Sequence, residues 1–217
     1  MDKGQLAPWA VLVVLPLAAA ATVGSTLALT PQSDELGPVT PHKRVPLCSP
    51  DAVLLEAHLG PKLKYSACKF EEGDSLADAE MKTLAEYQSK AGLAALAPGS
   101  RVLELGCGWG SLSLTNAAAF PALSFVGFSN SPQQIAHIRA KAAERGLSNL
   151  SVFVEDYADF VKPEASKVAP AGSALFDCAI AIETIEHAQN IEELLAAVAD
   201  RYGRHALGVG WHAGGDV

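Results

Sequence analysis

Between residues 74 and 202, apolar positions follow two spacings in turn, and this alternation predicts the secondary structure. Four short apolar runs predict buried strands: 101–106, 123–128, 150–155 and 176–182. Apolar residues at helical spacing predict helices around them: 74–92, 111–120, 131–145 and 190–202. An alternation of strands and helices of this kind is typical of a doubly wound α/β sheet.

Residues that cap helices mark where three of these helices begin. Asp74 or Ser75 can cap the first helix, and Ser131 stands before a proline at the first position of another. Asn190 and Glu193 have the spacing of a capping box at the start of the last helix. The capping residues therefore support the helix boundaries that the apolar spacing predicts.

The first 30 residues form a hydrophobic segment outside this pattern. Residues 7–29 are almost all apolar, and these 23 residues are long enough for a helix that crosses a bilayer, which needs about 20. The alanine-rich second half also resembles the end of a cleaved signal or transit sequence. We therefore expect a hydrophobic helix at 1–30, which is either an anchor that associates with a membrane through residues 7–29 or a targeting segment. Five prolines in residues 31–50 predict a linker.

The pattern of strands and helices ends near residue 202. Residues 203–217 contain five glycines among fifteen residues and show no strong periodicity, which predicts an irregular tail. Four strands are few for an α/β domain, and they would leave the sheet with a bare edge. We therefore expect the domain at 51–202 to be incomplete and its C-terminal strands to be missing, either in a truncated product or through a gene model that runs into non-coding sequence.

The composition excludes some classes of partner. The chain has 16 Lys and Arg against 24 Asp and Glu, a net charge of −8 and no run of cations, so we do not expect it to bind nucleic acid. A small molecule or a membrane lipid fits this charge better. None of the four cysteines forms a CxxC pair, so we expect no metal site. Free thiols point to a reducing compartment, where the domain is either membrane-anchored or organelle-targeted.

A glycine-rich loop follows the first predicted strand, with the sequence Glu104-Leu-Gly106-Cys-Gly108-Trp-Gly110. A loop of this kind between a strand and a helix is either a tight turn or the binding site of a nucleotide-type ligand. Its GxGxG spacing differs from the GxGxxG of dinucleotide loops, and the second strand ends at Ser129 and Asn130 without a carboxylate for a ribose. S-adenosylmethionine (SAM) needs instead a partner for its methionine ammonium, and Glu104 can act on that ammonium indirectly.

The loop resembles the first motif of the coclaurine N-methyltransferase group and of the related cyclopropane-fatty-acid synthases. Further segments between about residues 46 and 200 resemble other motifs of the group in the same order: 59–70, 129–134, 156–157 and 182–190. The resemblance implies a Rossmann-like SAM-dependent methyltransferase sheet with flanking helices. It also implies SAM as the cofactor and a small-molecule amine or a lipid as the substrate.

The resemblance assigns residues to the cofactor. Besides Glu104, Gly106, Gly108 and Gly110, they are Tyr65 and Ser66, which contact SAM in the family, Ser129, Asn130 and Gln134, which hold its ribose, and Asp156 and Tyr157, which contact its adenine. Each residue alone has a structural alternative: Gln134 can complete a capping box, Asp156 can end a strand and Tyr65 can be a core aromatic. Their order along the chain favours the functional interpretation.

The segment IETIEHAQN at 182–190 resembles the acidic-histidine motif of the group. An amine is protonated at neutral pH and must lose a proton before it attacks a methyl group. By resemblance, Glu183 and Glu186 hold the amine, and His187 helps to remove its proton. The alternative is a helix start whose acidic residues interact with the helix dipole. The resemblance favours catalytic roles for these three residues.

Two departures distinguish the substrates within the group. Cyclopropane synthases usually carry glycine at the position of Glu183, and cysteine at the position of Ala67. Both departures favour N-methylation of a small amine. Lipid modification of the cyclopropane type stays open, because the apolar N-terminal segment would place the enzyme beside lipids. An inactive, truncated SAM-binding protein is the third interpretation.

Overall fold

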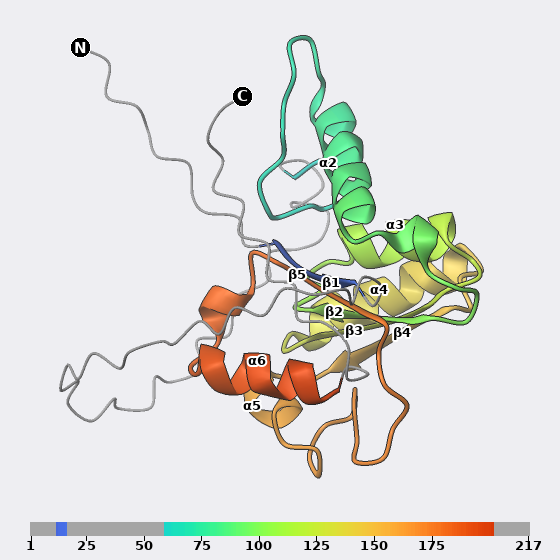
Figure 1. The fold of residues 1–217 in the computed structure, drawn as a ribbon. Helices are drawn as coiled ribbons and strands as arrows, with labels where there is room; N and C mark the ends of the chain where they lie inside the picture. The colour runs from blue at the N-terminus through green and yellow to red at the C-terminus, as the bar shows by residue number, and fades with distance from the viewer. Residues whose placement is uncertain (1–11, 17–58, 202–217) are drawn as a thin grey trace, which may run out of the picture.

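One five-stranded sheet organises the protein in a computed structural model that describes residues 12–16 and 59–201 (Figure 1). The strands are β1 (Leu12–Pro16), β2 (Arg101–Leu105), β3 (Ser124–Ser129), β4 (Leu150–Val154) and β5 (Cys178–Ile182). The helices are α2 (Leu76–Lys90), α3 (Ser111–Ala119), α4 (Pro132–Glu144), α5 (Tyr157–Phe160) and α6 (Ile191–Asp200), with 3-10 turns η1 (Leu93–Ala95) and η2 (Ile185–His187). The four predicted strands and four predicted helices are confirmed, whereas β1, α5 and the two 3-10 turns were not predicted.

The strand order is β1-β5-β2-β3-β4. Strands β5, β2, β3 and β4 run parallel, as expected for a Rossmann-like sheet. Leu105 at the end of β2 lies opposite Phe128 of β3 and Ala181 of β5, so these strands end at a common edge. Along the chain, β3 is added beside β2 and β4 beside β3, and the chain then crosses back so that β5 pairs with the opposite edge of β2. Proteins with such a reversal of strand order bind ligands beside it, at the carboxyl ends of the strands.

The predicted N-terminal helix is wrong at Leu12–Pro16. These residues form β1, which pairs antiparallel with β5 so that Leu12 lies opposite Ile182. Valines at 13 and 14 favour extended backbone, and β5 offers an edge of unpaired N–H and C=O groups for them to meet. The pairing also covers one edge of the sheet, whereas the four predicted strands left a bare edge in the sequence-based prediction.

Other predictions about the two ends of the chain concern residues outside the described ones, namely the rest of 7–29, the linker at 31–50 and the tail at 203–217. Within residues 12–16 and 59–201, no helix has both the length and the apolar character needed to cross a membrane. Membrane association through residues 7–29 therefore stays a prediction.

Helices cover both faces of the sheet (Figure 1). Leu103 and Leu105 of β2 point to a core that includes Phe160 of α5 and residues of α6. Val102, directly before Leu103, points to the opposite core, which contains residues of α2 and α3, including Leu112. This alternation is the two-residue period of a strand buried on both faces. Each fully buried large side chain contributes roughly 1.5–3 kcal/mol to folding.

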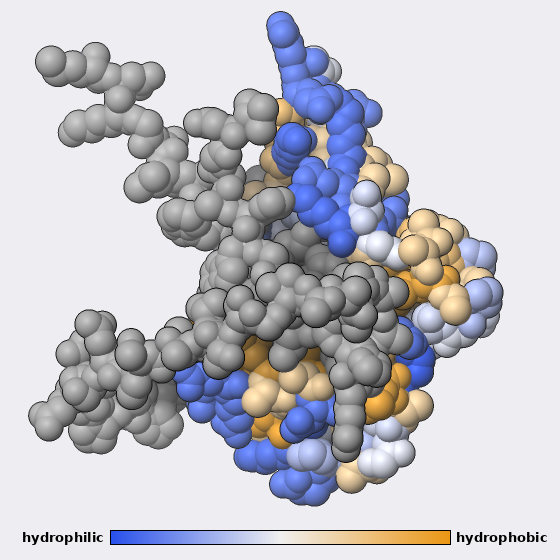
Figure 2. Space-filling model, in the orientation of Figure 1, coloured by the Kyte–Doolittle hydropathy of each residue, from blue (hydrophilic) through white to orange (hydrophobic). Residues whose placement is uncertain are grey.

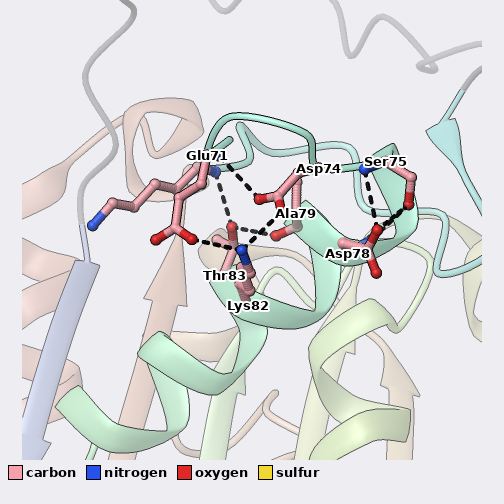
Figure 3. A network of polar contacts seen from close by, with 8 residues as sticks. Glu71, Asp74, Ser75, Asp78, Ala79, Lys82 and Thr83 are labelled. Atoms are coloured by element: carbon pink, nitrogen blue, oxygen red, sulfur yellow. Dashed lines mark hydrogen bonds and ion pairs between the residues drawn. The ribbon is translucent and has the colours of Figure 1, made fainter.

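The loop that precedes α2 is fastened to that helix by a polar network (Figure 3). Ser75 caps α2 in a capping box with Asp78, so Ser75 rather than Asp74 is the N-cap. Asp74 instead accepts from Lys82 Nζ at 2.7 Å, and Glu71 accepts from the same ammonium at 2.6 Å. This network lies on a hydrophilic part of the surface (Figure 2). It holds the loop against α2 on the solvent side, away from the sheet.

Candidate functional site

The glycine-rich loop turns the chain sharply from β2 into α3. Gly106 has φ +65°, and a Cβ atom there would lie 1.9 Å from Thr184 Oγ1, so the position admits glycine alone. Gly108 has φ +52°, but a Cβ atom there would meet nothing within 4 Å. Gly110 is the N-cap of α3. The loop thus packs tightly against the β5 end at Gly106 and presents bare backbone at Gly108.

Glu104 lies in β2, two residues before Gly106. Its carboxylate accepts a hydrogen bond from the Ser113 hydroxyl on α3. Burial raises the pKa of Glu104 to about 7, and the Ser113 hydrogen bond opposes that rise. A nearby cation stabilises the ionised form of such a buried carboxyl group, because the positive charge offsets the cost of burying a negative one. Glu104, in the strand before the glycines, is therefore suited to interact electrostatically with an ammonium group bound at the loop.

At the end of β3, Ser129 and Gln134 are brought together. Ser129 Oγ donates to Gln134 Oε1 at 2.6 Å and accepts from the backbone N–H of Ser131 at 3.2 Å. Gln134 donates its backbone N–H to the Ser131 cap at 3.4 Å, but its side chain is bonded to Ser129 and so does not complete a capping box. Asn130 is exposed beside them. Two of the three residues predicted to hold ribose therefore form one polar pair.

At the end of β4, Asp156 and Tyr157 have contacts within the protein. Asp156 caps α5 by accepting from the backbone N–H of Asp159 at 2.9 Å. The Tyr157 hydroxyl lies 2.5 Å from Thr184 Oγ1, and its ring meets Phe128 edge-on with centroids 5.7 Å apart. Tyr157 therefore connects the end of β4 to the end of β5.

Tyr65 is not a core aromatic, because it is 73% exposed. Its neighbour Ser66 accepts from Lys64 Nζ at 2.6 Å. The next residue, Ala67, donates its backbone N–H to both carboxylate oxygens of Glu183, at 3.1 and 3.2 Å. The Tyr65–Ala67 segment therefore lies against the end of β5, although 116 residues separate Ala67 from Glu183.

Glu183 follows β5 and has φ +46°, a left-handed conformation that is strained for a residue with a Cβ atom. Thr184 next to it is 8% exposed. His187 is exposed, and its backbone N–H donates to the Thr184 carbonyl at 3.1 Å. Glu186 lies between them in the turn η2. The first of the predicted catalytic residues, Glu183, thus lies directly at the carboxyl edge of the sheet, and the other two follow in η2.

The predicted residues gather at the ends of four parallel strands. The glycine loop follows β2, Ser129 ends β3, Asp156 follows β4 and Glu183 follows β5. The Tyr65 segment reaches the same edge from outside the sheet through the contact with Glu183. Among residues 12–16 and 59–201, no group of three or more His, Cys, Asp or Glu side chains could hold a metal ion.

Sequence reasoning missed two residues that shape this site. Thr184 forms a hydrogen bond with the Tyr157 hydroxyl and occupies the space that a side chain at Gly106 would need. Lys64 is 4% exposed and contacts the Tyr65–Ala67 segment from within. In the sequence, only their positions beside predicted site residues pointed to them: Thr184 lies inside the acidic-histidine motif, and Lys64 directly precedes Tyr65. A lysine is rarely buried, so its residue type argued for the surface.

The sequence that forms this site matches a known protein family. Residues 51–195 match the mycolic acid cyclopropane synthetase family. The chain belongs to this family. The match spans the glycine loop, the Tyr65 segment and the acidic-histidine motif. Membership in the mycolic acid cyclopropane synthetase family confirms the resemblance inferred from the motifs.

The relatives that the chain matches include N-methyltransferases and cyclopropane synthases. The chain is 33% identical over 145 residues to N-methyltransferase 4 of Papaver somniferum, covering 66% of this chain and 38% of that protein. It is 33% identical over 108 residues to the cyclopropane-fatty-acyl-phospholipid synthase of Escherichia coli strain K12, covering 49% and 26%. The chain therefore spans less than half the length of these curated relatives.

A solved relative confirms the sheet. A crystal structure of coclaurine N-methyltransferase bound to N-methylheliamine and SAH superposes with a TM-score of 0.59 and 28% identity. The similarity covers 70% of this chain and 42% of that chain. The fold is therefore the Rossmann-like methyltransferase sheet with flanking helices that the motifs implied.

Proposed function

We propose that the chain carries the catalytic site of a SAM-dependent N-methyltransferase that acts on a small amine. One observation carries the proposal: the carboxylate of Glu183 lies at the carboxyl edge of the sheet, on a residue whose φ of +46° favours glycine. A strained charged residue at the end of a strand is typical of a functional site rather than of a packing role. The N-methyltransferase relatives support the same choice.

The residues at the sheet edge fit SAM. Bare backbone at Gly108 leaves room for a ligand close to the loop, and the polar pair of Ser129 and Gln134 offers hydrogen bonds to ribose hydroxyls. Glu104 would balance the methionine ammonium from behind the loop, and exposed Tyr65 would close over the cofactor. When bound, SAM supplies a methyl group on a positively charged sulfur. The residues of this chain would hold the cofactor in place and orient it.

On the substrate side, the chain offers negative charge and a base. Glu183 would attract the ammonium form of the amine and hold it near the loop. Glu186 and His187 follow in η2, and we propose that Glu186 helps to hold the amine while His187 accepts its proton. Removal of that proton exposes the nitrogen lone pair that attacks the methyl group.

The proposal is tested by turnover of the full chain with isotopically labelled SAM. One reaction contains a panel of cyclic amines that includes coclaurine, and a second contains vesicles of phospholipids with monounsaturated acyl chains. We expect label in N-methylated amine and none in the acyl chains. Label in the acyl chains would establish the lipid-modifying alternative, and a folded chain that labels neither substrate would contradict the proposal.

The matched variant is Glu183→Gln, which keeps the size of the side chain and one oxygen that can accept from the Ala67 N–H but removes the charge. We expect this variant to bind S-adenosylhomocysteine as the parent chain does and to lose about tenfold or more in kcat/KM for the amine, the effect of a lost charged interaction. Unchanged amine turnover in Glu183→Gln would remove Glu183 from the proposed site.

A further inference from the structure

Lys64 places a charged ammonium group inside the protein. The residue is 4% exposed, and its Nζ donates to the Ser66 carbonyl at 3.0 Å, the Ser66 hydroxyl at 2.6 Å and the Ala67 carbonyl at 2.5 Å. An ammonium group has three N–H donors, so all of them are used within this one segment. The side chain thus folds back on the residues that immediately follow it and closes them into a compact loop.

The charge of Lys64 is balanced from several elements. Nζ lies 5.2 Å from the centroid of the Tyr87 ring on α2. Burial lowers the pKa of Lys64, while Cys68, Glu183 and Glu80 favour its charged form. Without such partners a buried ammonium would be strongly unfavourable. The ammonium therefore interacts electrostatically with α2 on one side and with Glu183 of the proposed amine site on the other.

The backbone around Lys64 is itself fixed to α2. Glu80 is completely buried, and its two carboxylate oxygens accept the backbone N–H groups of Lys62 and Lys64, each at 3.3 Å. Because Glu80 fixes the backbone at Lys64, the starting point of the Lys64 side chain is fixed too, and its contacts restrain the Tyr65–Ala67 segment. A continuous set of contacts thus runs from α2 through Lys64 and Ala67 to Glu183.

We propose that Lys64 is a positioning residue that fixes the conformation of the Tyr65–Ala67 segment for both the cofactor and the amine. By binding the carbonyls of Ser66 and Ala67, the ammonium leaves Tyr65 exposed for the cofactor and aims the Ala67 N–H at the Glu183 carboxylate. The cofactor part of this inference rests on the proposed function. The link from Lys64 to Glu183 does not, because it is a contact within the chain.

The test compares three variants of the full chain with the parent. Lys64→Met keeps the length of the side chain without its charge, Lys64→Gln keeps two N–H donors without charge, and Lys69→Met changes an exposed lysine of the same segment as the control. Residue-specific amide hydrogen exchange is measured without ligand, and the Kd of S-adenosylhomocysteine is measured by calorimetry.

For Lys64→Met we expect exchange at the Ala67 amide to be faster and S-adenosylhomocysteine binding to be weaker, each by about tenfold, as for loss of a charged hydrogen bond. Amides in the core of α2, such as that of Leu84, should exchange as in the parent. Lys64→Gln should recover part of both effects, and Lys69→Met should match the parent in both.

Parental exchange at Ala67 together with parental Kd in Lys64→Met would overturn the proposal. Equal acceleration at Ala67 and throughout α2 would also overturn it, because Lys64 would then stabilise the fold generally. If Lys64→Met does not fold, Lys64→Gln decides by the same two measurements, and if neither folds, a positioning role is overturned. Absence of S-adenosylhomocysteine binding in the parent would count against the proposed function, while the exchange at Ala67 would still decide the role of Lys64.

Discussion

Glu183 accepts the backbone N–H of Ala67 through both of its carboxylate oxygens, at 3.1 and 3.2 Å. This contact joins the segment predicted to cover the cofactor to the residue predicted to hold the amine. The two predicted halves of the site are therefore in direct contact in the folded chain. A carboxylate held in this way is also positioned before any substrate arrives, which reduces the entropy lost on binding.

The conformation of Glu183 predicts an unusual order of stability between two variants. Glu183→Gly and Glu183→Ala both remove the carboxylate, but only glycine is unstrained at φ +46°. We expect Glu183→Gly to be more stable than Glu183→Ala by about 1 kcal/mol, and both to lose amine methylation to a similar extent. Chemical denaturation of the two proteins measures the difference. Equal stability would show that the backbone at Glu183 is not strained in solution.

Two glycines of the loop should respond differently to the same change. In Gly106→Ala the new Cβ atom would lie 1.9 Å from Thr184 Oγ1, so we expect a loss of stability on the order of 3 kcal/mol or more from strain and steric conflict together. Gly108→Ala meets open space, so only the left-handed backbone costs about 1 kcal/mol. Thermal unfolding distinguishes the two variants.

Ligand binding provides the complementary readout for Gly108→Ala. If the bare backbone at Gly108 faces the cofactor, a methyl group there should weaken S-adenosylhomocysteine binding by about tenfold or more while the protein stays folded. A folded Gly108→Ala variant with parental affinity would place the cofactor elsewhere on the sheet edge.

The raised pKa of Glu104 predicts how stability depends on pH. The unfolded chain ionises this carboxyl group near its ordinary pKa of 4.5, whereas the folded protein keeps it protonated until about pH 7. The unfolded state thus binds fewer protons in this range, and the contribution of Glu104 to stability falls as the pH rises from about 4.5 to about 7.

The matched variant for this effect is Glu104→Gln, which can still accept the Ser113 hydroxyl. We expect Glu104→Gln to match the parent at pH 4 and to exceed it at pH 8 by an amount on the order of 3 kcal/mol at most. Glu164→Gln, which changes an exposed glutamate, serves as the control. Urea denaturation at the two pH values tests the prediction, which fails if the difference between parent and Glu104→Gln does not change with pH.

The sequence was informative wherever a local signal exists. Apolar runs such as 176–182 predicted the parallel strands, and Ser131 and Asn190 predicted helix starts, because burial and capping act over a few residues. The glycine spacing after Glu104 predicted the loop, since only certain residues adopt its backbone. The placement of predicted residues at one edge then followed from the rule for parallel sheets.

Contacts over long separations in the chain could not be predicted in this way. The pairing of β1 with β5 depends on an edge that forms only when the sheet has assembled, so an apolar segment read alone suggested a helix. Lys64 is buried because the carbonyls of Ser66 and Ala67, the ring of Tyr87 and the carboxylate of Glu80 surround it in the folded chain. No spacing along the sequence encodes such an enclosure.

Binding of S-adenosylhomocysteine to the full chain tests the proposed SAM site directly. It is measured by isothermal titration calorimetry on protein whose fold is checked by circular dichroism. We expect saturable binding at one site per chain, in competition with SAM and weakened in Gly108→Ala. A folded protein that gives no binding heat over the temperature range in which it stays folded, and from which equilibrium dialysis retains no SAM, would contradict the assignment of this sheet edge as a SAM site.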